Sequence, residues 1–160
     1  MATRTKIKPS AIPLVLERLV AVWDAASFPP GHTGRKPLVS LGSPGNSTDI
    51  EAIIIGTVES TQEWASIGAL GRNEEFTIEV DVLAAFHGQQ SMADAIDRVF
   101  ELWGTAVHEL RLNPTLGVAP SSSQGQVISI EVGTVKLVEV MRSQGRAAVI
   151  RSKLKVRARI

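Results

Sequence analysis

The sequence predicts a protein of the α+β class, in which two main helices pack on a mixed, mainly antiparallel sheet ending in a long C-terminal β-hairpin. Residues 76–82 and 150–160 alternate apolar with polar side chains, and this period of two sends neighbours to opposite faces of a strand. Two other segments repeat apolar side chains at steps of three and four, the spacing of a helix. Strands that mostly follow one another along the chain favour antiparallel pairing. The length of 160 residues suits one domain over residues 1–160.

The first helix is predicted from Ser10 to about Ala26, after a basic N-terminal arm of residues 1–9. Ser10 is a good N-cap residue, and Pro13 falls within the first turn, where proline is tolerated. One face of the helix is apolar and consists of Ile12, Leu16, Leu19, Val20 and Trp23. The sequence Phe28-Pro-Pro-Gly31 then ends the helix.

The middle of the chain is predicted to supply most of the strands. Residues 27–49 read as a long loop rich in turn residues, interrupted by one short strand. Strands are predicted at residues 38–41, 52–58, 61–65 and 76–82, with a flexible connection at 66–73. The last of these strands is half-buried, because its polar positions Thr77, Glu79 and Asp81 share one face.

The second helix is predicted from Ser91, its N-cap, to Asn113-Pro114, which stops it. Its apolar stripe comprises Met92, Ile96, Val99, Trp103, Val107 and Leu110. This stripe is broad enough to pack the helix on a sheet. A long loop at residues 113–126 follows.

The chain is predicted to end in a hairpin whose last strand has one basic face. A strand at residues 127–141, with a bulge near Gly133, is joined by a short turn at 143–146 to the terminal strand. The even positions of that strand are apolar apart from Ser152, and its odd positions are Arg151, Lys153, Lys155, Arg157 and Arg159. The apolar side belongs in a core, whereas the cations must meet water, carboxylates, another subunit or a polyanion. Because Glu79 and Asp81 stand on another strand of the same period, we expect carboxylates before phosphates.

Charge is distributed in blocks along the chain. Residues 1–36 carry a net charge of +4, residues 37–141 carry −10 and residues 142–160 carry +7, although the whole chain is only +1. Such blocks either compensate one another within the fold or dock charge to charge on other copies or partners. No apolar run approaches the ~20 residues of a membrane span, and the lack of Cys excludes disulfides and thiolate metal sites. We therefore expect an intracellular, soluble protein.

The sequence contains no recognisable catalytic, cofactor or metal site. Each of its three histidines stands alone, without a second ligand at metal-site spacing: His32, His87 and His108. The carboxylate pairs Glu74–Glu75 and Glu79–Asp81 are interpreted as a solvated face or as salt-bridge partners. The glycine-rich segments lack the spacing of phosphate-binding loops. Since no aromatic residue interleaves with the terminal cations, we expect no direct nucleic-acid binding.

Four pieces of the chain, taken in order, carry a family resemblance that covers about residues 10–160. They are the N-terminal amphipathic helix, the stretch Ser66-Ile-Gly-Ala-Leu-Gly-Arg-Asn-Glu-Glu-Phe-Thr-Ile-Glu-Val80, the helix leading into Asn113-Pro-Thr-Leu-Gly117, and the hairpin closing on Val156-Arg-Ala-Arg-Ile160. Together they resemble the tail terminator (tail completion) proteins of long-tailed bacteriophages, especially those from phages of actinobacteria. The loop at residues 27–49 matches no feature of that family.

The resemblance implies a structural protein of the virion that forms a homo-oligomeric ring, typically a hexamer. Such a ring caps the finished tail tube, stops the addition of tail-tube protein and presents its other side to the head–neck connector or stopper protein. It lies at the head-proximal end of the tail after assembly from the host cytoplasm. DNA may pass through it, and no membrane, catalysis or cofactor is involved.

The candidate interface is assigned to charged residues of the strands and the stretch before them. These are Arg72, Glu79, Asp81, Arg151, Lys153, Lys155, Arg157 and Arg159. Two alternative functions remain open at this point. One is another ring of the phage neck, such as a head–tail stopper or adaptor, and the other is a nucleic-acid-binding module that uses the basic strand.

Overall fold

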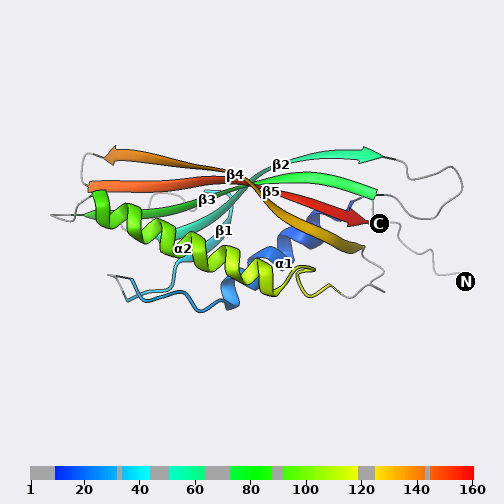
Figure 1. Cartoon of the computed structure of the whole chain (residues 1–160), viewed down its shortest axis with the longest axis horizontal. Helices are drawn as coiled ribbons and strands as arrows, with labels where there is room; N and C mark the ends of the chain where they lie inside the picture. Colours follow the sequence, from blue (N-terminus) through cyan, green and yellow to red (C-terminus); the bar gives the residue numbers. More distant parts are fainter. Residues whose placement is uncertain are drawn as a thin grey trace, which may run out of the picture.

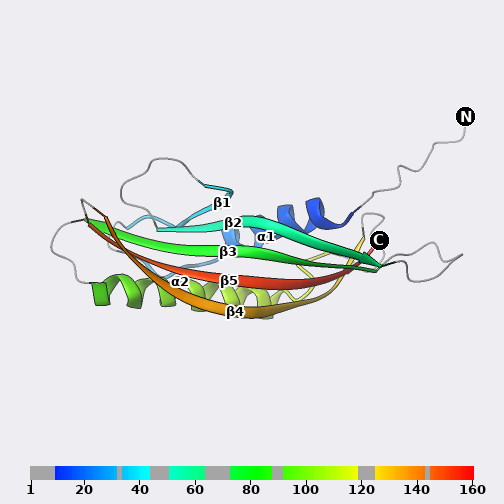
Figure 2. The same cartoon turned by 90° about the horizontal axis from the view of Figure 1, so that it is seen from above.

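Two helices and five strands make up the part of the chain that the structure describes. The computed structural model describes residues 10–31, 34–43, 51–63, 73–87, 92–118, 125–142 and 145–160. The elements are α1 (Ile12–Ala25), β1 (Leu38–Leu41), β2 (Glu51–Glu63), β3 (Asn73–His87), α2 (Met92–Leu112), β4 (Gln126–Arg142) and β5 (Gly145–Arg159). The long strands form one twisted sheet, and both helices lie on the same side of it (Figures 1 and 2). The predicted α+β class is confirmed.

The strands of the sheet follow the order β1-β2-β3-β5-β4. β1 runs parallel to β2, and every other neighbouring pair is antiparallel, so the sheet is mixed and mainly antiparallel as predicted. β4 and β5 form the predicted C-terminal hairpin, and β5 lies between β3 and β4. The terminal strand is therefore held by a ladder of backbone hydrogen bonds on both sides.

Bulges let two strands continue past a break in the sequence pattern, and one of them, β2, differs from its prediction. The strands predicted separately at 52–58 and 61–65 are one strand, β2, as far as its described end at Glu63, and its register with β3 shifts between Ile55 and Val58. β4 bulges between Val132 and Val135, as predicted near Gly133. A Cβ on Gly133 would lie only 2.9 Å from the backbone oxygen of Lys153, so the close approach requires glycine.

The core lies between the helices and one face of the sheet, called here the helix face. It is formed from β3 and β5 by Phe76, Ile78, Val80, Val82, Ile150, Leu154 and Val156, all buried. The predicted core side of the terminal strand is thus confirmed. Trp23 of α1 is fully buried, and its indole Nε1–H donates a hydrogen bond to the backbone oxygen of Ala106 in α2 at 3.1 Å. This bond fixes the two helices to each other at the centre of the layer.

The boundaries of both helices lie close to the predicted ones. α1 begins at Ile12 with Ala11 in the N-cap position, so Ser10 stands one residue before the cap. α2 ends at Leu112, directly before Asn113-Pro114. Neither helix combines the length and the apolar content that crossing a membrane requires. The predicted arm at 1–9, the cap Ser91 and residues 66–72 of the predicted connection lie outside the described residues.

Candidate functional site

The face of the sheet opposite the helices, called here the outer face, carries the predicted row of cations. Arg151, Lys153 and Arg157 project from β5 on this face and are largely exposed. The β3–β5 register places Asp81 opposite Arg151, Glu79 opposite Lys153 and a third carboxylate, Glu75, opposite Arg157. The period of two and the antiparallel register together build this charge ladder.

Three ion pairs join β5 to β3 across the outer face. The distances are 3.5 Å from Arg151 Nε to Asp81 Oδ2, 3.6 Å from Lys153 Nζ to Glu79 Oε1, and 2.6 Å from Arg157 Nε to Glu75 Oε1. The expectation that the cations meet Glu79 and Asp81 holds, and the partners belong to the same chain. Exposed pairs of this kind contribute little to stability, because water and salt screen them. The ladder therefore orders the surface more than it stabilises the fold.

The ion pairs differ in the pKa values of the side chains that form them. Partial burial raises the pKa of the Asp81 carboxyl, and the neighbouring Glu79 adds to this, against the opposing effect of Arg151. The hydrogen bond to Glu75 raises the pKa of Arg157, so this guanidinium stays charged at every accessible pH. The ladder thus contains one firm pair, at Arg157, and one looser pair, at Asp81.

The remaining predicted interface residues are not held in ion pairs by the part of the chain that the structure describes. Lys155 lies opposite Thr77 on one side and Glu131 on the other, without an ion pair to a described carboxylate. Arg159 stands opposite Asn73 and Gln126. Arg72 lies outside the described residues. Of the five cations at odd positions from Arg151 to Arg159, Lys155 and Arg159 are therefore the two that pair with no described carboxylate.

Glu74 has a structural role that the sequence analysis missed. It was interpreted together with Glu75 as part of a solvated or salt-bridged face, which is wrong for Glu74, because its side chain is fully buried. Its carboxylate accepts hydrogen bonds from Ser10 Oγ (2.8 Å), from the backbone N–H of Ala11 (2.8 Å) and from Ser60 Oγ (3.1 Å). Ser10 in turn accepts a bond from the N–H of Ile12 at 3.0 Å. A carboxylate of β3 thus caps the positive end of α1.

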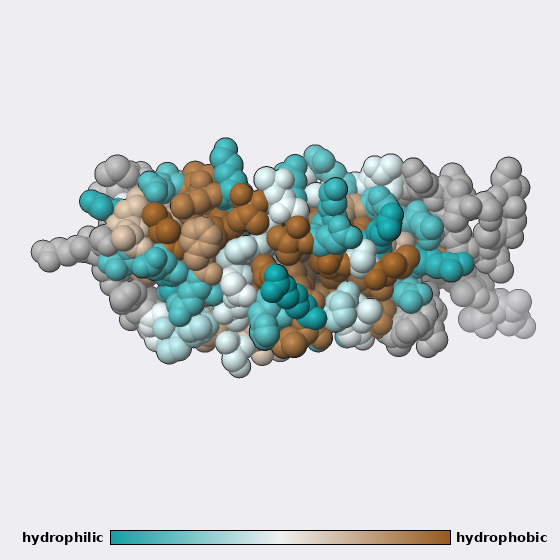
Figure 3. All heavy atoms as spheres, in the orientation of Figure 1, coloured by the Kyte–Doolittle hydropathy of each residue, from teal (hydrophilic) through white to brown (hydrophobic). Residues whose placement is uncertain are grey.

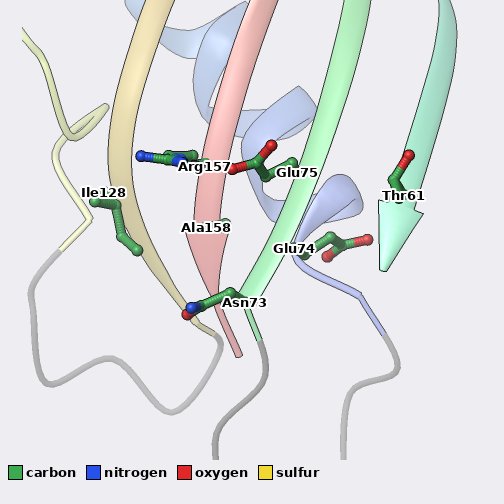
Figure 4. A pocket seen from close by; sticks show the side chains of 7 residues that line it. All are labelled: Thr61, Asn73, Glu74, Glu75, Ile128, Arg157 and Ala158. Atoms are coloured by element: carbon green, nitrogen blue, oxygen red, sulfur yellow. Dashed lines mark hydrogen bonds and ion pairs between the residues drawn. The ribbon is translucent and has the colours of Figure 1, made fainter. Parts of the chain in front are cut away.

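A small hollow lies at the end of the sheet where β3 begins, and both Glu74 and Glu75 line it (Figure 4). Its volume is about 320 Å³, and it is lined by Thr61, Asn73, Glu74, Glu75, Ile128, Arg157 and Ala158. The Glu75 carboxylate reaches Arg157 Nε at 2.6 Å, whereas Glu74 points toward β2 and the start of α1 (Figure 4). Both carboxylates are already engaged by protein groups, so this hollow offers no poised acid or base.

A second buried charge, also missed by the sequence analysis, ties α2 to the start of β2. Arg98 donates from Nε to Glu51 Oε1 at 3.0 Å and from Nη2 to Glu51 Oε2 at 2.6 Å, and both side chains are nearly inaccessible. Arg98 also donates to the backbone oxygen of Pro29 at 2.8 Å and to Glu101 at 2.5 Å. Burial acts to lower the pKa of Arg98, but the hydrogen bonds and charges of Glu51 and Glu101 have the larger combined effect and raise it.

Gly31 closes over this buried pair. A Cβ there would overlap the Glu51 carboxylate and would lie 2.8 Å from Arg98 Nη2. The glycine of Phe28-Pro-Pro-Gly31 therefore has a packing role in addition to ending the first helix. The signal for Arg98 was its position three residues after Ala95 and four before Leu102, on the buried side of α2.

The two edges of the sheet carry most of the exposed apolar side chains. Eight large apolar side chains are well exposed among the described residues: Leu38, Leu41, Phe100, Leu112, Ile128, Val132, Val135 and Leu137. Two of them lie on β1 and four on β4, which are the edge strands. Figure 3, which looks onto the β4 side of the molecule, shows brown apolar surface over this region. Val132 of β4 lies opposite the buried Leu154 but is itself exposed, because the helix layer ends before this edge of the sheet.

A groove between α2 and β4 marks where that helix layer ends. Its volume is about 750 Å³, and it is lined by Trp103, Val107, Leu110, Arg111, Pro114, Ile130, Glu131 and Val132. The first bulge of β4, between Val127 and Ser129, additionally turns Ile128 outward. β4 therefore presents both an open backbone edge and an apolar surface.

No cluster that could hold a metal ion is found within the described ranges of the chain. His108 is exposed on α2, as predicted. His32 and the side chain of His87 lie outside the described part. The features that the geometry does present are a charged outer face and two apolar edges.

The same fold occurs in a chain described as part of the "Virion of native gene transfer agent (GTA) particle". The two structures align with a TM-score of 0.66 over 96% of this chain and 100% of the other, at 11% sequence identity. At this identity the likeness establishes a shared fold. The sequence itself matches no protein-family profile and no curated protein.

Proposed function

We propose that the protein is a structural component of a phage-like virion, and specifically a tail terminator that forms a ring on the end of the tail tube. The observation that carries the proposal is the shared fold with a chain from a gene transfer agent virion over the full length of that chain. The sequence resemblance to tail terminators points independently to the same kind of particle. A ring of such subunits would stop tube growth and offer its other side to the neck.

The surface chemistry supports assembly with other protein chains. Three of the five terminal cations already pair with carboxylates of β3, which reduces the charge available for a phosphate backbone. A nucleic-acid-binding module that depends on this strand is therefore the weaker alternative. Exposed apolar side chains on both sheet edges favour protein contacts instead.

The test is to add the purified protein to polymerising tail-tube protein of the same particle and to measure tube lengths by electron microscopy. We expect shorter tubes with one end occupied by the protein. Unaltered tube lengths with no protein at the tube ends would overturn the tail-terminator role.

Charge reversals supply a matched comparison for that assay. Arg159→Glu changes a cation of the outer face that pairs with no described carboxylate, and Arg18→Glu makes the same charge change on an exposed residue of α1. We expect only the first to weaken capping if the outer face contacts the tube or the neighbouring subunit.

A head–tail stopper or adaptor would instead bind the neck and leave growing tubes unchanged.

A further inference from the structure

The two edge strands of the sheet are aligned with each other along the strand direction. One row of paired residues crosses all five strands through Leu41, Ile55, Val80, Ser152 and Val135. The next rows begin on β1 and end on β4 as Ser40 to Lys136, Val39 to Leu137 and Leu38 to Val138. The four residues of β1 therefore lie level with residues 135–138 of β4, at opposite edges of one sheet.

The two ends of each row lie on the same face of the sheet, and apart from Ser40 and Lys136 both ends are apolar. Leu41 (58% exposed) and Val135 (43% exposed) both lie on the helix face of the sheet. Leu137 shares that face, as does Val39 at the other edge. Leu38 and Val138 lie on the outer face. Each edge thus offers an apolar strip that the other edge could cover.

The directions of the two edge strands, β1 and β4, also allow them to pair between two copies. β1, β2 and β5 run in one direction, and β3 and β4 run in the other. If a second copy continued the sheet in the same orientation, its β1 would lie antiparallel to β4 of the first. Antiparallel partners directly opposite each other share a face, so Val135 would meet Leu41 and Leu137 would meet Val39.

We propose that β4 of one subunit pairs with β1 of a second copy of this chain, in the register that joins Val135 to Leu41. The inference rests on the proposed ring and specifies its subunit contact. The two surfaces are different, so the contact is heterologous, and such contacts repeat around a closed ring. Because the paired segments lie level along the strands, each addition shifts the next subunit little along that direction, which is what closure requires.

The contact also accounts for an edge that is otherwise a liability. β4 is 17 residues long, and its exposed apolar side chains accompany an open backbone edge. Long apolar edges of this kind attract other strands unless they are covered. A neighbour's β1 covers the central part of β4 and buries apolar side chains from both subunits.

Disulfide trapping tests the contact, because the chain contains no cysteine of its own. The double variant Leu41→Cys with Val135→Cys is oxidised at high protein concentration and analysed on non-reducing gels. Facing residues of antiparallel strands have Cα atoms about 4.5–5.5 Å apart, within the range that a disulfide bridges. We expect a ladder of covalent multimers at least tenfold stronger than in either single variant. Covalent trapping records brief encounters, so a stable ring in solution is not required.

A one-residue shift provides the matched control. Leu41→Cys with Lys136→Cys places the two thiols on opposite faces and should give no ladder, whereas Ser40→Cys with Lys136→Cys restores the register and should give one. Circular dichroism verifies that each variant is folded. Equal ladders in all pairs, or dimers from Val135→Cys alone, would overturn the proposed contact in favour of nonspecific or β4–β4 pairing.

The disulfide-trapping experiment tests the edge contact, and the tube-length assay tests the tail-terminator role. Shortened tubes from a protein that gives no ladder would overturn the edge contact and leave the tail-terminator role intact. A register-specific ladder from a protein that leaves tubes unchanged would support the edge contact and overturn the role.

Discussion

Glu74 and Glu75 are neighbours in the sequence, yet they lie in opposite environments on the two faces of the sheet. Glu74 is 0% exposed on the helix face, where it accepts hydrogen bonds from Ser10 and Ala11, just before α1, and from Ser60 of β2. Glu75 is 61% exposed on the outer face and meets the equally exposed Arg157. Burial, and not residue type, therefore decides whether a charge holds the fold together or equips a surface.

The same contrast separates the two arginine–glutamate pairs. Arg98 and Glu51 are buried and bound through two parallel hydrogen bonds, whereas Arg157 and Glu75 share one bond in contact with water. A buried charge that loses its partner cannot be rehydrated without opening the core. The helix face is thus sensitive to loss of a charge, and the outer face tolerates it.

The largest effect is expected for Arg98→Met. The change leaves the Glu51 carboxylate buried without its partner, and such losses cost about 3–5 kcal/mol. Urea denaturation followed by circular dichroism measures the loss. Arg157→Met is the matched control, and its loss of stability should be much smaller, because both partners of that pair are in contact with water.

The double variant Glu51→Leu with Arg98→Met sharpens this prediction. It removes both charges and should recover much of the lost stability, because no unpaired charge remains. Equal losses from Arg98→Met and Arg157→Met would show that burial does not separate the two pairs.

The next effect is expected for Glu74→Ala. This change leaves the Ala11 N–H and the Ser10 hydroxyl without their acceptor at the start of α1, at a cost of about 2 kcal/mol. Glu75→Ala is the adjacent control on the outer face, with an expected loss below about 1 kcal/mol. Hydrogen exchange of the first turn of α1 should rise only for Glu74→Ala. Protection that stays unchanged in that variant would contradict the capping role.

The sequence predicts those features of the fold that depend on local pattern. The alternation at residues 150–160 correctly placed Ile150, Leu154 and Val156 in the core and the cations on the other side. Counting back by two from Phe76 also places Glu74 on the buried face, but a carboxylate there contradicts simple hydrophobic patterning. Its partner, the N-terminus of α1, is about sixty residues away in the chain.

Features that depend on tertiary context were not predictable in the same way. The Arg98–Glu51 pair joins α2 to β2, and although Arg98 falls on the buried side of α2, no local pattern identifies Glu51 as its partner. Strand order is equally nonlocal, and it decides that β4 is an edge and that its apolar positions stay exposed. Ile128 is exposed for a similarly nonlocal reason, since a bulge in the β4–β5 pairing turns it outward.

A smaller effect on stability is expected for Arg157→Glu on the outer face. The reversal breaks the pair with Glu75 and places two carboxylates together, so a small loss of stability is expected, and it should shrink at high salt. If the outer face takes part in assembly, tube capping should fall severalfold although the variant folds. Arg18→Glu on α1 should leave capping unchanged. Equal capping by both variants would mean that the outer face is only a solvated surface.

The smallest effect, and one of opposite sign, is expected for Asp81→Asn. Partial burial raises the pKa of Asp81 in the folded protein above its ordinary value of 3.8, so the folded state binds the proton more tightly than the unfolded chain does. Wild-type stability therefore falls as the pH rises through the range just above 3.8, and the variant avoids that loss. At pH 7 the variant should be more stable by less than about 1 kcal/mol, and the difference should vanish as the pH is lowered through this range. Thermal unfolding of both proteins at several pH values measures it. Lower stability of Asp81→Asn at pH 7 would mean that the 3.5 Å pair with Arg151 outweighs burial, which would make the Asp81 pair as firm as the Glu75 pair.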